Sequence, residues 1–362
     1  MYMPFVRQAI QNTKVPLQLI MAILKALLLA IIVWCLCFSS TLLEARELND
    51  DSSMVARHES WMAQYGRVYK DDADKMMRFE IFKENVAFIE TFNAGNHKFS
   101  LGVNRFADLT NEEFRATRTN KAFKRDSMSI LIGFKYENIS LNSLPTTVDW
   151  RTKGAVTPIK DQGDCGSCWA FSAVAAIEGI TKLTTGKLFS LSEQEIVDCD
   201  VNGTEDGCQG GWMDGAFNFT ITNGGLTTEA NYRYKGKQGK CKADKATEST
   251  VTINGYEDVP ADDEAALMKA VANQPVSVVM DSSDTAFQFY SSGVINGHCG
   301  TNFDHAITAI GYGIAGDGTK YWLLKNSWGI TWGERGYVRM EKDIANKKGM
   351  CGVAMIPSYP TI

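Results

Sequence analysis

Cys168 stands at the junction of a polar stretch and an apolar one, a position that suits a nucleophile. Residues 162–169 are rich in glycine and cysteine, and the run from Ala170 to Glu178 favours a helix. Cys168 would lie in the first turn of that helix, where partial positive charge and unpaired N–H groups favour a thiolate. Those N–H groups could also hold the oxyanion formed when the thiolate attacks a carbonyl, with the Gln162 side chain as a second donor.

The spacing Cys165-x-x-Cys168 also fits a redox motif or half of a zinc site. Residues 162–169 alone do not distinguish a nucleophile from these two alternatives. The chain has nine cysteines, of which Cys35 and Cys37 lie in an N-terminal apolar run. Seven remain, so in an oxidising compartment six would pair and one would stay free. The free cysteine is either the nucleophile or a buried spare.

A thiolate needs a base, and two histidines follow Leu144. His298 adjoins Cys299 and is typical of a loop. His305 opens an apolar strand, where it could line a cleft or serve only a structural role. An imidazole also needs an acceptor on its other nitrogen, which Asn326 or its rival Asp304 could supply. The indoles of Trp328 and Trp332 could shield that bond, or simply pack in a core.

The first 45 residues resemble a leader. Residues 26–38 form an uncharged apolar run with Lys25 before it, the pattern of a signal peptide, and we expect cleavage after Ala45. Met21 would begin a more ordinary signal peptide than Met1 does. An uncleaved anchor over residues 15–38 is disfavoured because Lys25 would fall in its middle.

Two composition changes divide the rest. Residues 46–143 carry 15 basic and 15 acidic side chains, whereas residues 144–362 carry 19 and 26; a net charge of −5 overall argues against nucleic-acid binding. Residues 55–93 have helical periodicity, and residues 101–109 predict a strand and a turn. Thr110 or Asn111 could cap a short helix, with Glu113 placed for a capping box from Thr110, and residues 115–143 predict an extended connector.

After Leu144 the pattern predicts a helical half, about residues 154–250, and a β half, about residues 251–358. This is an α+β arrangement. One helix, near residues 262–273, should interrupt the strands of the β half. The predicted strands are residues 250–253, 276–280, 306–310, 321–325 and 336–340.

Together these residues resemble the papain family of cysteine proteases. Cys165–Trp169 reads Cys-Gly-Ser-Cys-Trp, the family signature, which has its histidine and asparagine about 130–150 residues downstream. His305 is 137 residues beyond Cys168, and Asn326 is slightly far at 158. The resemblance implies that Cys168 is the nucleophile, His305 the base and acid, Asn326 the orienting residue, and Gln162 an oxyanion donor.

The upstream region resembles the inhibitory propeptide of that family, closest to plant senescence-associated, vacuolar enzymes. The family's interrupted helical motif is present, with Asp74 in place of its usual first glutamate; its residues are Asp74, Arg78, Phe82, Asn85, Ile89 and Asn93. The second propeptide motif, Gly-x-Asn-x-Phe-x-Asp, is complete at Gly102, Asn104, Phe106 and Asp108. The resemblance implies a propeptide over 46–143 that blocks the cleft until acid weakens its carboxylate pairs, with Asp108 as one sensor, and a mature enzyme over 144–362.

The resemblance also implies a two-lobed fold with three disulfides, Cys165–Cys208, Cys199–Cys241 and Cys299–Cys351, which would remove the redox and zinc alternatives. The pocket for the substrate residue two before the scissile bond would be apolar and prefer Leu, Phe or Val. Its lining residues would be Trp212, Met213, Val279, Ala306 and Ile356. Gly210, Gly211, Asp304 and Trp328 would also contact substrate, and Gln209 departs from the asparagine usual in that glycine loop.

The implied function is a secretory cysteine endopeptidase made as a zymogen, destined for an acidic vacuole or lysosome-like compartment or for the exterior. The alternative is a non-catalytic storage or inhibitory protein on the same fold. Implied partners are peptide and protein substrates, the chain's own propeptide and cystatin-like inhibitors; we expect a monomer with no cofactor, metal, nucleic acid or stable membrane insertion. Three sequons could carry glycans: Asn138, Asn202 and Asn218.

Overall fold

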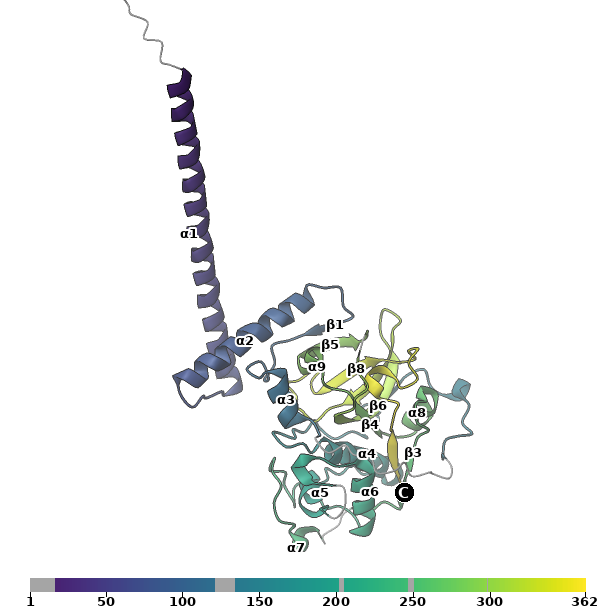
Figure 1. Cartoon of the computed structure of the whole chain (residues 1–362). Helices are drawn as coiled ribbons and strands as arrows, with labels where there is room; N and C mark the ends of the chain where they lie inside the picture. The colour runs from purple at the N-terminus through teal and green to yellow at the C-terminus, as the bar shows by residue number, and fades with distance from the viewer. Residues whose placement is uncertain (1–16, 121–133, 202–204, 247–250, 298) are drawn as a thin grey trace, which may run out of the picture. The chain divides into compact units, whose positions relative to one another are not determined.

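A long helix opens the described part of the chain. The computed structural model describes residues 17–120, 134–201, 205–246, 251–297 and 299–362, and its contacts divide the chain into two units, residues 1–69 and 70–362. The first unit holds α1 (Leu17–Tyr65), which contains the apolar run 26–38 (Figure 1). Within the described ranges no helix is long and apolar enough to cross a membrane. The signal peptide stays a prediction.

The second unit begins with a helix and a strand. Asp71 caps α2 (Asp72–Asn93) by accepting the Asp74 N–H, and Phe82, Val86 and Ile89 form its buried side. A short strand, β1 (Phe99–Leu101), follows. The helical periodicity predicted within residues 55–93 is confirmed, and the strand begins two residues before the predicted one.

The capping box at Thr110 is confirmed. Its Oγ1 accepts the Glu113 N–H at 3.2 Å, and the Glu113 carboxylate accepts the Thr110 N–H at 3.0 Å, so α3 (Asn111–Arg118) starts where predicted. The extended connector was predicted from residue 115, but α3 continues to Arg118. Beyond it come a 3-10 turn, η1 (Leu141–Ser143), and β2 (Val148–Asp149).

Helices lead the predicted helical half. The largest is α4 (Cys168–Thr185), which is buried from Cys168 to Thr181 and ends at Gly186, whose φ of 76° lets the chain turn away. Around it lie α5 (Glu193–Cys199), η2 (Gly207–Gln209), α6 (Met213–Thr222) and α7 (Ala243–Ala246). Their core packs Trp169, Val174 and Phe217.

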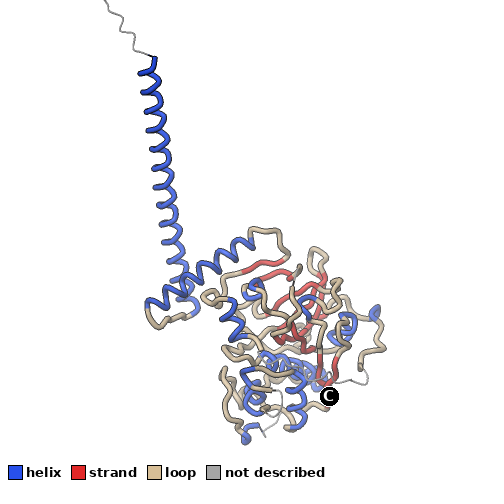
Figure 2. Tube along the Cα trace, in the orientation of Figure 1, coloured by secondary structure: helices blue, strands red, loops and turns tan. Residues whose placement is uncertain are grey.

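One mixed sheet forms the other half. The nine described strands run in the order β1-β5-β8-β7-β6-β4-β9-β3, with β2 paired to β6. The remaining strands are β3 (Gly255–Asp258), β4 (Val276–Met280), β5 (Tyr290–Ile295), β6 (His305–Ile314), β7 (Lys320–Lys325), β8 (Tyr337–Glu341) and β9 (Ser358–Thr361). Figure 2 shows these strands gathered beside the helices α4, α5 and α6. The α+β, papain-like prediction is confirmed.

Four of the five predicted strands are present. The prediction at residues 250–253 was wrong within the described residues, since Val251 makes only an isolated bridge to Leu226 and β3 starts at Gly255. Four described strands were missed, β2, β3, β5 and β9. Gly293 and Pro360 interrupt the β-forming patterns of β5 and β9. The predicted helix near 262–273 is α8 (Glu264–Val271), but a second short helix, α9 (Thr285–Gln288), also lies among the strands.

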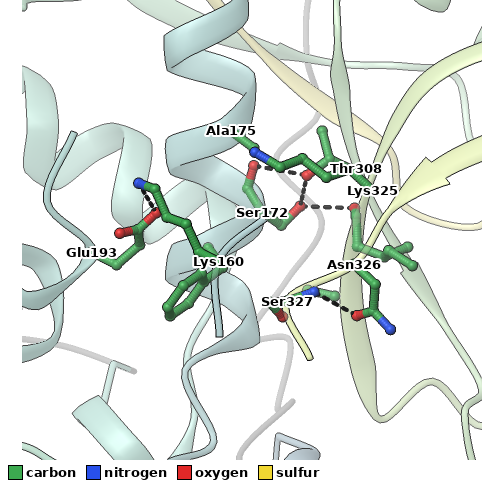
Figure 3. Close-up of a pocket in the computed structure, with 11 residues that line it drawn as sticks. Lys160, Ser172, Ala175, Glu193, Thr308, Lys325, Asn326 and Ser327 are labelled. Atoms are coloured by element: carbon green, nitrogen blue, oxygen red, sulfur yellow. Dashed lines mark hydrogen bonds and ion pairs between the residues drawn. The ribbon is translucent and has the colours of Figure 1, made fainter. Parts of the chain in front are cut away.

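A buried ionic cluster links the two halves. Glu178 of α4 accepts hydrogen bonds from Lys160 at 3.1 Å and from the Thr157 hydroxyl at 2.6 Å. Lys325 of β7 donates to the same hydroxyl at 2.8 Å, and Lys160 also donates to Glu193 at 2.6 Å. Figure 3 shows Lys160 and Glu193 on one side and Lys325 with Asn326 on the other. Two lysines thus balance two glutamates within the interior.

Glu178→Gln should lower the free energy of unfolding by about 3–5 kcal/mol, because it leaves two buried lysines with one carboxylate. Urea unfolding of the full chain measures the change. The control is Asp149→Asn, which breaks a half-exposed pair with Arg151 and should cost at most about 1 kcal/mol. Equal losses in the two variants would contradict a structural role for the cluster.

Candidate active site

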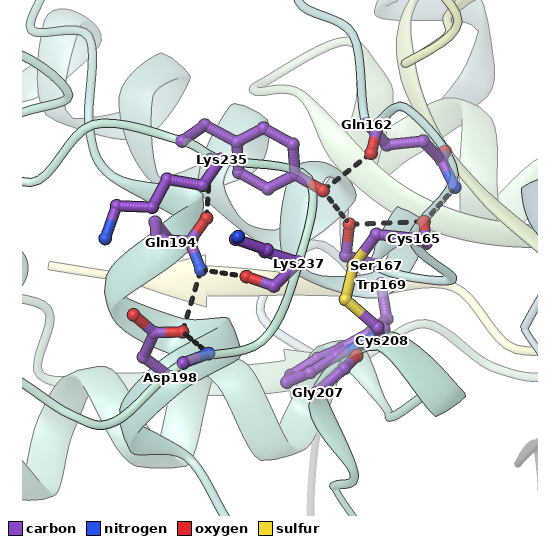
Figure 4. Close-up of a disulfide and its surroundings, with 12 residues drawn as sticks. Gln162, Cys165, Ser167, Trp169, Gln194, Asp198, Gly207, Cys208, Lys235 and Lys237 are labelled. Atoms are coloured by element: carbon purple, nitrogen blue, oxygen red, sulfur yellow. Dashed lines mark hydrogen bonds between the residues drawn. A yellow bond between two sulfur atoms is a disulfide. The ribbon is translucent and has the colours of Figure 1, made fainter.

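Cys168 is the first residue of α4 and carries a free, buried thiol. Cys165, three residues earlier, is bonded to Cys208, and the other described pairs are Cys199–Cys241 and Cys299–Cys351. Figure 4 shows the Cys165–Cys208 bond beside Trp169, one residue beyond the thiol. The three disulfides implied by the resemblance are therefore present, and Cys165 is not available to a zinc ion or to a redox pair with Cys168.

His305 and Asn326 come from neighbouring strands. His305 opens β6, and Asn326 directly follows β7, which pairs antiparallel with β6. The His305 Nε2 lies 2.8 Å from the Asn326 Oδ1, and that oxygen also accepts the Ser327 N–H at 2.8 Å. Because a backbone N–H can only donate, the Asn326 atom is an oxygen, and Nε2 must carry the proton. Asp304, the rival, instead accepts hydrogen bonds from Ser282.

The other ring nitrogen of His305, Nδ1, is buried and makes no hydrogen bond within the described chain. The next residue, Ala306, donates its N–H to the Cys168 sulfur at 3.4 Å, so the start of β6 meets the start of α4. The Trp328 ring stacks on His305 with centroids 4.5 Å apart and shields the imidazole from water. The neutral tautomer thus has a lone pair at Nδ1.

Both groups are uncharged in this state. Burial raises the pKa of Cys168 to about 12, with the Ala306 N–H acting in the opposite sense. Burial lowers the pKa of His305 to about 4, with the Asn326 hydrogen bond opposing it. Both side chains have no exposed surface. Without water, the low dielectric disfavours either ion, so thiol and imidazole remain neutral between these values.

Hydrogen bonds fix the orientation of the Gln162 side-chain amide. Its Oε1 accepts the Ser327 hydroxyl at 2.7 Å, and its backbone N–H donates to the Ser327 carbonyl at 2.8 Å. The side-chain amide is thereby oriented, and Nε2 donates to two carbonyls, that of Cys165 at 2.9 Å and that of Arg118 at 3.0 Å. A donor suited to an oxyanion is occupied here by a carbonyl from the end of α3.

Residues 118–120 run along this site. The Asn120 N–H donates to the Asp304 carbonyl at 2.7 Å, and its side chain donates to the Gly211 carbonyl at 2.6 Å. Phe114 of α3 packs edge-on against Trp328, with centroids 5.0 Å apart. The segment therefore occupies the Gln162 donor and is bonded to residues beside Cys168 and His305.

Two family descriptions match most of the chain. Residues 144–361 match the family description Papain family cysteine protease, and residues 58–114 match the Cathepsin propeptide inhibitor domain (I29). The chain belongs to the papain family of cysteine proteases. It is a protease made with an inhibitory propeptide, so α2, β1 and α3 lie in a prosegment that covers the site.

The relatives include plant enzymes. The chain is 68% identical over 341 residues to Senescence-specific cysteine protease SAG39 of Oryza sativa subsp. indica, covering 94% of this chain and 100% of that one. It is 54% identical to Senescence-specific cysteine protease SAG12 of Arabidopsis thaliana, covering 90% and 95%.

Solved precursor structures are similar as well. Recombinant stem bromelain precursor has a TM-score of 0.80 at 45% identity, covering 86% of this chain and 99% of that one. The proform of the ragweed pollen allergen Amb a 11 has a TM-score of 0.81 at 43% identity, covering 88% and 97%.

The five residues expected to line a papain-family specificity pocket share one apolar cluster. Met213, Val279 and Ala306 are buried in it, and Trp212 and Ile356 pack against it from partly exposed positions. Phe303, which the sequence did not single out, packs on Trp212 with ring centroids 5.9 Å apart. All five side chains are apolar, so together they suit an apolar substrate side chain.

The glycine loop before this pocket leaves its backbone open. Gly210 has a φ of 135°, and a Cβ on Gly211 would meet the Trp169 ring at 2.6 Å. Only glycine therefore fits at residue 211 against the Trp169 ring. Gln209, the departure from the family pattern, lies in η2. Of the sequons, Asn138 and Asn218 are exposed, and Asn202 lies outside the described residues.

Sequence reasoning missed three contributors to the site. Ser327 orients Gln162, the Arg118 carbonyl accepts from the Gln162 amide, and the Tyr234 hydroxyl donates to the Gln162 carbonyl at 2.7 Å. Ser327 directly follows Asn326, and this position next to a predicted site residue could have indicated its role. The other two carry no local pattern that marks them, since both act through chain segments distant in sequence.

Ion pairs join the prosegment to the enzyme body. Arg105 pairs with Asp161, Arg118 pairs with Asp164 at 2.5 Å, and Arg115 approaches Asp304 at 3.4 Å. Asp108 was predicted as an acid sensor. It lies within the propeptide match, residues 58–114, and its backbone carbonyl accepts a hydrogen bond from Arg78 at 3.0 Å. Its sensing role stays a prediction.

A second carboxylate of the prosegment is a clearer candidate. The Arg78 guanidinium donates to Glu113 at 2.7 Å, and this hydrogen bond lowers the pKa of Glu113 below its ordinary value, although burial opposes it. A carboxyl with a depressed pKa stabilises the folded state fully above its unfolded pKa, about 4.3, and this stabilisation is lost as the pH falls through its lower folded pKa. Acid should therefore loosen the prosegment at this pair.

Glu113→Gln should speed processing of the full chain at pH 7 by about two- to fivefold, the value of one partly exposed pair, and should speed it by less at pH 3, where protonation weakens the wild-type pair. The appearance of the shortened chain on a gel measures both rates. Glu112→Gln, an exposed neighbour in the same helical turn, is the control with the same charge change. If the two variants behave alike at pH 7, the Arg78–Glu113 pair has no part in release.

Proposed function

We propose that Cys168 and His305 hydrolyse peptide bonds as a thiolate–imidazolium pair once the prosegment has left. Nδ1 of His305 takes the thiol proton, and the thiolate attacks a substrate carbonyl carbon. The resulting oxyanion is held by the Gln162 Nε2 and the backbone N–H of Cys168. The imidazolium then protonates the leaving amine, and water hydrolyses the thioester with His305 as base.

The single observation that carries this proposal is the meeting of the two halves at 3.4 Å, between the Ala306 N–H and the Cys168 sulfur. His305, the preceding residue, has Nε2 bound to Asn326 and Nδ1 without a partner among the described residues. A nucleophile, a base and an orienting group in this sequence of contacts form the arrangement that nucleophilic catalysis needs.

The ion pair should form only after activation. Burial under the prosegment keeps both groups neutral, with pKa values of about 12 and about 4. Removing residues 118–120 admits water to the cleft, which reduces the penalty on both ions and lets their mutual attraction act. The prosegment would thus inhibit in two ways, by occupying substrate positions and by keeping the thiol uncharged.

Cleavage before Leu144 would give the mature enzyme over residues 144–362. The three disulfides support a secretory route, because such bonds persist in oxidising compartments. We propose an acidic vacuolar or lysosome-like compartment, or the exterior, as the destination, with a cleaved signal peptide at the start and glycans on exposed sequons such as Asn218.

Cys168→Ala should abolish turnover, by at least about a thousandfold, and leave the chain folded. The measurement is acid-activated hydrolysis of a Phe-Arg reporter, with a thiol-directed epoxide as inhibitor and circular dichroism as a check on folding. A Cys168→Ala chain that still hydrolyses the reporter would remove Cys168 from the role. A processed wild-type chain without epoxide-sensitive hydrolysis would favour the non-catalytic storage or inhibitory alternative.

The mature enzyme should prefer Leu, Phe or Val at the substrate residue two before the scissile bond, because the cluster that would receive it is apolar. A peptide library varied at that position measures the preference. Ile356→Glu should raise the relative kcat/KM for arginine by up to about fivefold, since one new charge pair at a partly exposed site is worth at most about 1 kcal/mol. A wild-type preference for arginine would refute the pocket assignment.

A further inference from the structure

The hydroxyl of Tyr234 joins the two ends of the catalytic loop. It donates to the Gln162 carbonyl at 2.7 Å and lies 2.7 Å from the Ser167 hydroxyl. Gln162 carries the side-chain oxyanion donor, and Ser167 directly precedes Cys168. Figure 4 shows Gln162, Cys165 and Ser167 close together in this loop.

The direction of these hydrogen bonds follows from proton counting. A tyrosine hydroxyl has one proton, and the Gln162 carbonyl can only accept it. The Ser167 hydroxyl must therefore donate to the Tyr234 oxygen. The result is a chain of two hydrogen bonds, from Ser167 to Tyr234 and from Tyr234 to Gln162.

This chain also affects the helix N-terminus. Ser167 is the N-cap of α4, and a serine there usually accepts an N–H of the first turn. Here it makes no side-chain cap. The N–H groups of Cys168 and Trp169 instead lie close enough to the Cys168 sulfur to lower its pKa. Turning the Ser167 hydroxyl toward Tyr234 keeps those donors directed at the reacting centre.

Tyr234 is itself firmly held. Its N–H donates to the Glu229 carboxylate at 2.9 Å, and its ring packs edge-on against Phe171 of α4, with centroids 4.8 Å apart. Burial raises the pKa of Tyr234, so the hydroxyl keeps its proton through the range in which the enzyme would work. The tyrosine is a fixed support for a loop that lacks regular structure.

We propose that Tyr234 is a positioning residue for the oxyanion hole. By tying the Gln162 carbonyl to Ser167, it sets the separation between the Gln162 side-chain amide and the Cys168 N–H, the two donors that must converge on one oxygen. The inference rests on the proposed function. Tyr234 acts through Gln162 and Ser167 and has no direct contact with the His305–Asn326 pair among the described hydrogen bonds.

The first test is Tyr234→Phe in the processed enzyme. It should lower kcat about tenfold, because small misplacements of reacting groups cost up to about a hundredfold, and leave KM within about twofold. The acidic limb of the pH–rate profile should not move, since that limb reports the Cys168–His305 pair. A shift of that limb with the loss of kcat would overturn the proposal, and so would an unchanged kcat.

Tyr232→Phe is the matched control. Tyr232 lies two residues earlier and is buried, and its hydroxyl donates to Asp198 at 2.9 Å, away from the catalytic loop. It should alter thermal stability and leave kcat unchanged. If Tyr232→Phe lowers kcat as much as Tyr234→Phe does, the effect is general loosening of the helical half and the proposal fails.

A double-mutant cycle shows the route of action. In a Gln162→Ala background, Tyr234→Phe should lower kcat by less than about twofold, because the donor it positions is gone. An undiminished tenfold loss there would overturn the proposal. Ser167→Ala breaks the same chain from its other end and should reproduce the loss, which keeps the test available if Tyr234→Phe does not fold. Absence of hydrolysis by the wild type would instead refute the proposed function.

Discussion

The contact between the N-terminus of α4 and the start of β6 is the constraint on which the molecule depends. Cys168 belongs to the helical half and His305 to the β half, and the Ala306 N–H reaches the Cys168 sulfur at 3.4 Å. Neither half alone holds both groups. Buried charges also join the two halves: Lys325 of the β half lies 3.9 Å from the Glu178 carboxylate of the helical half and donates to Thr157. A small shift between the halves would separate base from nucleophile.

The prosegment occupies polar groups that we propose a substrate uses. The Arg118 carbonyl accepts a hydrogen bond from the Gln162 amide, and Asn120 donates to the Asp304 and Gly211 carbonyls. On this proposal, inhibition follows from occupation of existing hydrogen-bonding positions. The arginines that hold the segment face aspartates of the enzyme body, so charge helps to keep it in place.

Burial sets the charge state of Cys168 and His305 before activation. In the zymogen it holds Cys168 and His305 neutral, which is the wrong state for attack on a carbonyl. The helix N-terminus and the Asn326 hydrogen bond favour the charged forms, but they are outweighed while the cleft is covered. Removal of the covering segment changes the solvent around an arrangement of side chains that is already built.

The sequence by itself determined the local features. The Thr110–Glu113 capping box, the start of a helix at Cys168 and the odd number of cysteines all follow from neighbouring residues, and the signature around Cys168 indicated the family. Backbone dihedral preferences and caps depend on residues a few positions apart, so such features can be predicted. Only the tertiary structure decided that Asn326 rather than Asp304 holds His305, that Arg118 occupies the Gln162 amide, and that Tyr234 ties the loop. These are contacts between distant segments, and they exist because the whole chain closes in space, which no local preference encodes.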